Sequence, residues 1–142
     1  MLRKYLGPIS WVLALLTLSF SASAADSTNK IVLQLSDSSP EKQVLVLNVA
    51  QNLHRSYGKD ASIEIVAFGP GLPMLLADNP NNKRIQSLAS KGIRFSACRN
   101  TVRKISKLAG EEPVLDANAK MVIGGAERIV ELVNQGYILI RP

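Results

Sequence analysis

Short apolar runs alternate along the chain with stretches in which apolar residues recur at spacings of three and four. The runs predict strands at residues 31 to 35, 62 to 68, 93 to 97, 121 to 123 and 137 to 140. The helical spacing predicts helices at residues 41 to 57, 83 to 91, 102 to 109 and 126 to 135. Strands that alternate with helices are typical of a parallel sheet with right-handed crossovers. We therefore expect a three-layer α/β/α sandwich with a five-stranded, mainly parallel sheet covered on both faces.

Turn residues separate these elements. Ser38 and Glu41 have the spacing of a capping box, and Pro40 is tolerated in the first helical turn. Gly69-Pro70-Gly71 breaks the second strand, and the apolar residues 72 to 77 that follow have no clear conformation. Residues 111 to 119 are expected to form an irregular connection.

The first 25 residues have the pattern of an export signal. Arg3 and Lys4 precede an apolar stretch at residues 9 to 20, and small residues follow at 21 to 25. Cleavage is expected after Ala24 or one residue later, which leaves a single domain at residues 26 to 142 in the periplasm or outside the cell. A retained anchor is the alternative, but spanning a bilayer needs about 20 apolar residues. No second stretch approaches that length, so we expect no membrane association after cleavage.

Charge and composition narrow the choice of partners. The net charge of the whole chain is +6, from 17 Lys and Arg against 11 Asp and Glu, and removal of Arg3 and Lys4 lowers it to +4. Aromatic residues make up only 5% of the chain, which argues against base stacking. We therefore expect no nucleic-acid partner, and solubility explains the mild positive charge.

Ligands of open parallel sheets bind outside the carboxyl ends of the strands. In this chain that edge gathers Ser36 after the first strand, Gly69 and Gly71 after the second, Cys98, Arg99, Asn100 and Thr101 after the third, and Gly124 and Gly125 after the fourth. We take these residues as the candidate site.

Cys98 is the only cysteine of the chain and the leading candidate for chemistry. At a helix start beside Arg99, Arg103 and Lys104, its thiol pKa should fall, which would favour the nucleophilic thiolate. The alternatives are a small buried core residue and an intermolecular disulfide. His54, the only histidine, lies about four turns into its helix, so no Cys-His pair is expected.

No metal-ligand cluster can be assembled from one cysteine, one histidine and scattered acids, and no cofactor is expected. The chain carries six basic residues between Lys91 and Lys107, which mark either a surface for an anion or acidic partner or a solvated helix face.

Three segments, GIRFSACRNTV at 92 to 102, IEIVAFGPGLPMLL at 63 to 76 and GGAERIVELVNQGYILIRP at 124 to 142, together resemble the DsrE/DsrF-like family of sulfur-relay-type proteins, and within it an exported branch. The resemblance extends from about Lys30 to Pro142. It implies the α/β fold, assembly into trimers or hexamers, and a cysteine that carries sulfur as a persulfide. By position that cysteine is Cys98, with Asn100 and Thr101 as contacts of the sulfur.

Two functions remain open at this point. In the first, Cys98 accepts sulfur as a persulfide and exchanges it with a donor or acceptor protein. In the second, the protein is a non-catalytic oligomer that binds a small ligand or a partner, and Cys98 is structural. Redox exchange through a C-x-x-C pair is excluded because the chain has no second cysteine.

Overall fold

The computed structural model describes residues 29–142, so the predicted signal peptide and its cleavage site lie outside the described part. Five strands form one sheet in the order β4-β3-β2-β1-β5, and every pair of neighbours is parallel. The strands are β1 (Asn29–Leu35), β2 (Ala61–Ala67), β3 (Arg94–Cys98), β4 (Ala119–Val122) and β5 (Ile138–Ile140). The predicted fold class is confirmed.

Helices connect the strands. They are α1 (Pro40–Tyr57), α2 (Asn82–Ala89), α3 (Arg99–Ala109) and α4 (Gly125–Asn134), with two 3₁₀ segments, η1 (Gly58–Asp60) and η2 (Gly69–Leu75). The segment at 72 to 77, whose conformation the sequence left open, lies mostly within η2. The connection at 111 to 119 is irregular as expected, and an isolated bridge between Leu76 and Leu115 holds it against the end of η2.

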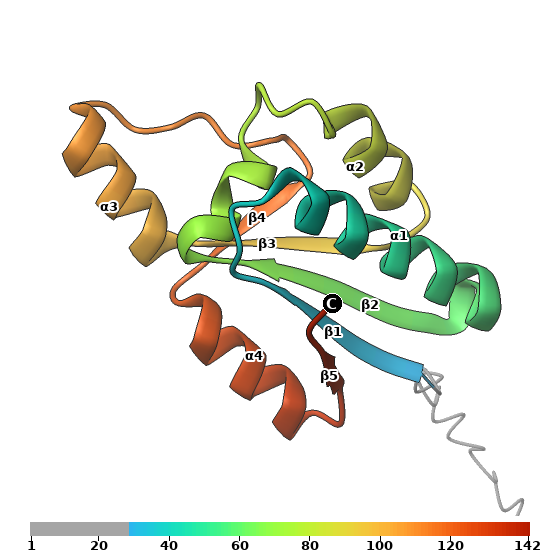
Figure 1. The fold of residues 1–142 in the computed structure, drawn as a ribbon. Helices are drawn as coiled ribbons and strands as arrows, with labels where there is room; N and C mark the ends of the chain where they lie inside the picture. The colour runs from blue at the N-terminus through green and yellow to red at the C-terminus, as the bar shows by residue number, and fades with distance from the viewer. Residues whose placement is uncertain (1–28) are drawn as a thin grey trace, which may run out of the picture.

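The strand order explains how the helices are distributed. From β1 to β4 the chain moves across the sheet in one direction, and it then returns through α4 to place β5 on the other side of β1. Since crossovers between parallel strands are right-handed, a reversal of direction moves the connecting helix to the opposite face. Figure 1 shows this arrangement, with α1 and α2 on one face and α4 on the other.

The two faces differ in how much apolar surface they bury. The larger core joins alternate residues of β1, β2 and β3 to α1, α2 and η2, and α3 contributes the buried Val102 and the partly buried Ile105. The smaller core lies under α4 and contains Val32, Val66, Ile129 and Leu132. Helix α3 buries only Val102 and projects from one end of the sheet (Figure 1).

The start of α1 differs from the predicted capping box. The N-cap is Ser39, not Ser38, and its Oγ accepts a hydrogen bond from the Lys42 N–H at 3.1 Å. Pro40 explains the shift, because the residue before a proline is held extended, as an N-cap residue must be. Ser39 has that conformation, with φ −66° and ψ 133°, so the pairing predicted for Ser38 and Glu41 is wrong.

None of the helices between residues 29 and 142 is long and apolar enough to cross a membrane.

Candidate functional site

Cys98 ends β3 and is the N-cap residue of α3, so it lies at the junction predicted from the sequence. Side chains alternate along a strand, and Phe95 and Ala97 point into the larger core. Ser96 and Cys98 therefore face the opposite side of the sheet, the side covered by α4. The Cys98 residue is only 4% exposed.

The hydrogen-bond donors around the sulfur favour its ionised form. Burial raises the pKa of the Cys98 thiol, but the Thr101 hydroxyl and the backbone N–H groups of Thr101, Gly125 and Asn100 lower it by more, so the pKa lies below its ordinary value. Two of these N–H groups belong to the first turn of α3 and one to the first turn of α4. Free N–H groups at helix starts carry partial positive charge, which stabilises an anion.

Thr101 connects the sulfur to the loop after β2. Its Oγ1 accepts a hydrogen bond from the backbone N–H of Gly69 at 2.8 Å. A hydroxyl has one hydrogen to donate, and this contact leaves that hydrogen available to Cys98. Gly69 has a φ of +53°, a conformation that other residues adopt with strain, so glycine here allows the loop to present its N–H to Thr101.

The second glycine of the Gly124-Gly125 turn allows the start of α4 to approach the sulfur. A Cβ on Gly125 would lie 2.6 Å from the Cβ of Phe68, which closes off the space beside it. The sequence placed both Gly124 and Gly125 at this edge, and of the two it is the Gly125 N–H that lowers the pKa of Cys98. Gly124 is the N-cap residue of α4.

The arginines next to Cys98 hydrogen-bond elsewhere. Arg99 Nε donates to Met121 Sδ at 3.4 Å, and an Arg103 terminal nitrogen donates to Asn100 Oδ1 at 2.5 Å. The groups that lower the Cys98 pKa are instead backbone amides and the Thr101 hydroxyl. Two causes of a lowered Cys98 pKa were predicted, the helix start and the neighbouring cationic side chains. The helix-start amides act on the sulfur more directly than the cations do.

Ser36 and Gly71 have other contacts. Ser36 Oγ accepts from Gln34 Nε2 at 3.1 Å, beyond the end of β1. Gly71 packs against β1, where a Cβ would lie 2.4 Å from the Leu35 carbonyl oxygen. Neither is among the groups that lower the pKa of Cys98. The groups that lower the Cys98 pKa lie near the carboxyl end of β3. They do not lie next to β1, where the chain reverses the direction in which it crosses the sheet.

His54 does not pair with Cys98, as predicted. It lies in the last turn of α1, and α1 runs antiparallel to the strands, so that turn is at the amino edge of the sheet. Among residues 29–142, no group of three or more His, Cys, Asp and Glu could hold a metal ion.

A buried ionic cluster under α4 was missed in the sequence. Glu64 on β2 is 1% exposed, and its carboxylate accepts from Ser96 Oγ at 2.7 Å, from Arg94 Nε at 3.0 Å and from two Arg128 nitrogens at 2.8 and 2.9 Å. Burial raises the pKa of Glu64, but the hydrogen bonds from Arg128, Ser96 and Arg94 lower it by a larger amount. The pKa of Glu64 therefore lies below its ordinary value. Tyr137 extends the cluster by accepting from Arg94 at 2.7 Å.

A sequence signal for this cluster existed. A strand buried on both faces of a parallel sheet is expected to be almost continuously apolar. Glu64 interrupts β2, and Arg94 and Ser96 interrupt β3, so all three residues should find polar partners in the interior. The cluster lies on the same face of β3 as Cys98 and fixes α4 through Arg128.

A parallel α/β domain with one buried cysteine, held by amide donors at the carboxyl edge of its sheet, is thus the class of protein defined by fold and site. The family comparison is more specific. The chain belongs to the DsrE/DsrF-like family, whose model matches residues 17–142.

A solved structure supports the same fold. The chain is similar to the protein of unknown function MTH1491 from Methanobacterium thermoautotrophicum, with 26% identity and a TM-score of 0.72. The match covers 80% of this chain and 99% of that one. A comparison with curated proteins finds no match.

Proposed function

We propose that this protein handles sulfur through a persulfide on Cys98. One observation carries the proposal: the buried sulfur is surrounded by the Thr101 hydroxyl and the N–H groups of Asn100, Thr101 and Gly125, which lower the thiol pKa. A thiolate is the nucleophile that attacks a sulfane sulfur. The same donors suit a persulfide anion, and family membership supports a sulfur-relay-type role.

Mass spectrometry tests the proposal directly. Mature protein is incubated with thiosulfate or polysulfide, and the mass at Cys98 is compared with that of the Cys98→Ser variant. We expect one added sulfur atom, removable by a reducing thiol, in the wild type alone. Absence of added sulfur at Cys98 would remove the basis of the proposal.

The burial of Cys98 favours a second candidate, in which the protein is a non-catalytic oligomer that binds a small ligand or partner. At 4% exposure the residue resembles a core cysteine. A thiol reagent separates the two candidates. Reaction of Cys98 in the native state supports the persulfide, whereas reaction only after unfolding supports the structural role.

Homo-oligomerisation is part of both candidates. Family resemblance implies trimers or hexamers, and α4 and β5 expose large apolar side chains: Val130 is 59% exposed, Val133 43%, Ile138 65% and Leu139 44%. We take these exposed apolar groups of α4 and β5, two elements that contact each other, as the proposed interface. A donor or acceptor protein for sulfur remains a separate expectation of the persulfide function.

Export belongs to the same proposal. The n-region, apolar stretch and small residues at 1 to 25 support a cleaved signal and a periplasmic or secreted protein. N-terminal sequencing of the protein purified from its host should find Ala25 or Asp26 as the first residue. An intact Met1 in that material would contradict cleavage.

A further inference from the structure

Helix α3 carries one sign of charge along its whole length. Its residues include Arg99, Arg103, Lys104 and Lys107, and its sequence RNTVRKISKLA contains no acid. All four cationic residues are exposed. An excess of one sign on an exposed face creates a local potential that attracts ions of the other sign.

Among residues 29–142, no acidic side chain forms an ion pair with a cation of this face. In the part of the chain from residue 29 onward, the ion pairs join Glu64 to Arg94 and Arg128, and Arg128 to Glu131. None of them involves a cation of α3. The charges that do find partners on this helix contact neutral atoms, such as Asn100 Oδ1 for Arg103.

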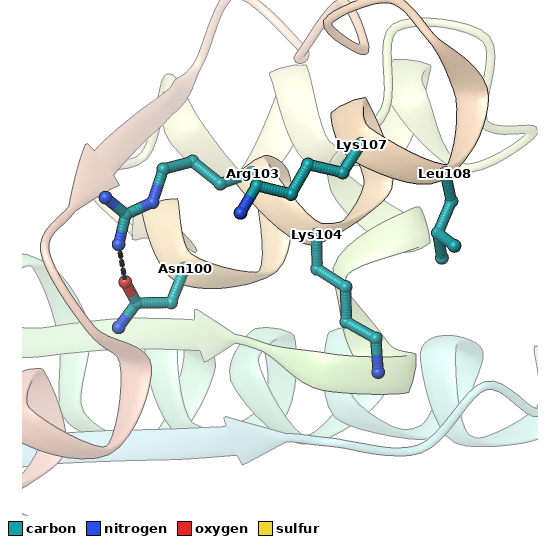
Figure 2. A pocket seen from close by; sticks show the side chains of 5 residues that line it. All are labelled: Asn100, Arg103, Lys104, Lys107 and Leu108. Atoms are coloured by element: carbon teal, nitrogen blue, oxygen red, sulfur yellow. Dashed lines mark hydrogen bonds between the residues drawn. The ribbon is translucent and has the colours of Figure 1, made fainter.

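Two clefts of about 520 Å³ each adjoin this face. The first is lined by α3 alone, through Asn100, Arg103, Lys104, Lys107 and Leu108. Figure 2 shows the Arg103 guanidinium turned toward Asn100 and the Lys104 side chain leaving the helix on another side. The second cleft lies between α3 and η2, and Asn100, Lys104 and Leu108 line it as well.

Both clefts reach the first turn of α3, the helix whose N-cap residue is Cys98, although Cys98 itself is buried and lines neither cleft. Asn100 lines both of them, and Thr101 lines the second. These are also the two α3 residues whose backbone N–H groups lower the pKa of Cys98. An anion held at that end of α3 would therefore lie within about one helical turn of the residue that carries the proposed nucleophile.

From this placement we infer that the basic face of α3 recruits a small sulfur oxyanion, of which thiosulfate is the simplest, as the sulfur donor of Cys98. The inference rests on the proposed persulfide function. In the step, the Cys98 thiolate attacks the outer sulfur of thiosulfate and a new S–S bond forms. The S–S bond of thiosulfate breaks, and sulfite leaves with its electron pair, so no oxidant or reductant is needed.

The chemistry explains why cations are needed there. A thiolate and a thiosulfate dianion repel each other, and the step keeps all the negative charge at the site. Uncompensated cations on the approach reduce this repulsion, whereas a neutral donor would gain nothing from them. A symmetric contact between the α3 helices of two copies of the chain would bring like charges together, which disfavours that alternative use of this face.

The test measures how Cys98 reacts with two alkylating reagents that differ in charge, iodoacetate and iodoacetamide. The ratio of their rates cancels the thiolate fraction and the opening that exposes the sulfur, so it reports only the effect of reagent charge. The α3 variant combines Arg103→Gln, Lys104→Gln and Lys107→Gln. The control combines Arg55→Gln, Lys59→Gln and Lys91→Gln, which are exposed residues at the amino edge of the sheet.

The two variants are matched. Each loses one arginine and two lysines, and Arg55, like Arg103, contacts an asparagine three residues earlier. At about 10 mM salt the iodoacetate-to-iodoacetamide ratio should fall about threefold in the α3 variant and stay close to wild type in the control. At about 1 M salt the three proteins should agree.

Three results overturn the inference: an unchanged ratio in the α3 variant, an equal fall in both variants, or a native Cys98 that neither reagent reaches. If the α3 variant does not fold, as judged by circular dichroism, Lys104→Gln alone and the salt dependence of the wild type give the same reading.

The alkylation ratio does not depend on persulfide chemistry. A ratio that responds to α3 charge while thiosulfate leaves no sulfur on Cys98 means that the proposed function fails and the anion-attracting face remains. Sulfur loading from thiosulfate that is equally fast in the wild type and the α3 variant means that the inference fails and the persulfide function stands.

Discussion

The backbone N–H of Gly69 donates to the side-chain oxygen of Thr101 at 2.8 Å, which joins the loop after β2 to the first turn of α3. This bond occupies the hydroxyl oxygen as an acceptor and leaves its hydrogen for Cys98. The state of the sulfur thus depends on a residue three positions away and on a loop about 30 residues earlier in the chain.

Thr101→Val should weaken the reactivity of Cys98. The change keeps the shape of the side chain and removes the hydroxyl, so the thiolate loses a donor and the Cys98 pKa rises. A hydrogen bond to a charged group contributes about 1.5–3 kcal/mol, so alkylation at neutral pH should slow about tenfold. The measurement is the rate of iodoacetamide reaction as a function of pH, with the midpoint moved upward in the variant.

Thr101→Ser is the matched control, because it keeps the hydroxyl and removes only a methyl group. Its pH profile should stay near that of the wild type. If valine and serine shift the profile equally, the hydroxyl is not a donor to the sulfur and packing explains the effect.

Gly125→Ala should destabilise the domain by about 1–3 kcal/mol, the usual cost of overpacking. Its new Cβ would lie 2.6–2.7 Å from three Phe68 side-chain atoms, which cannot move away without shifting β2. The start of α4 would then withdraw from Cys98, and alkylation at neutral pH should slow as well. Urea unfolding gives the free energy of unfolding.

Gly124→Ala provides the comparison within the same turn. Its Cβ would meet only the carboxylate end of Glu127, a flexible side chain that can rotate away. We expect a loss below about 1 kcal/mol, which reflects the weaker N-cap preference of alanine. Equal losses in both variants would show that close packing against Phe68 is not what requires glycine at 125.

Much of the fold could be predicted because its signals are local. Apolar runs and helical spacing are properties of neighbouring residues, and they predicted every strand and α-helix to within a few residues. Local signals failed where two rules competed. At the start of α1, capping-box spacing favoured Ser38, whereas the restriction that Pro40 places on its predecessor determined the N-cap at Ser39.

The site could be predicted only in part, because its contacts cross between strands. Topology rules brought Cys98, Thr101 and Gly69 to one edge, but a sequence does not show which amide reaches the sulfur. Gly125, and not its neighbour Gly124, supplies that amide, because the way α4 packs on the sheet determines which residue lies near the sulfur. The Glu64 cluster likewise joins distant parts of the chain, since Arg94 follows Glu64 by 30 positions and Arg128 follows it by 64. The polar residues that interrupt two apolar strands were its only signal in the sequence.

Val130→Gln together with Ile138→Gln should weaken assembly. These residues are 59% and 65% exposed in the single chain, and burying them is the expected driving force for association. Sedimentation velocity should show a smaller species, or the same species at a higher protein concentration. Leu108→Gln on α3, which is 80% exposed, is the control and should leave the oligomer unchanged. A monomeric wild type would contradict the oligomer itself.

The Glu64 cluster should make the domain sensitive to acid. The Glu64 pKa is lowered in the folded state, so the stability it contributes is present above the unfolded pKa of about 4.5 and is lost as the pH falls through the folded value. Glu64→Gln should therefore be less stable than the wild type at pH 7 and should lose less stability on going below about pH 4.5. The Glu131→Gln control, which removes a 60% exposed partner of Arg128, should keep the acid sensitivity of the wild type.

Within the same cluster, removal of a cation should cost more than removal of the carboxylate. Arg94 and Arg128 have side chains 41% and 27% exposed, so they can reach water when Glu64 becomes glutamine. Glu64 is 1% exposed, so Arg128→Met leaves the Glu64 carboxylate buried with fewer hydrogen-bond donors. The free energy of unfolding should therefore fall by about 3–5 kcal/mol. The Glu64 pKa then rises, and acidification should destabilise Arg128→Met less steeply than the wild type. Urea unfolding at pH 7 and below pH 4.5 measures both effects, and a larger loss in Glu64→Gln than in Arg128→Met would contradict the argument.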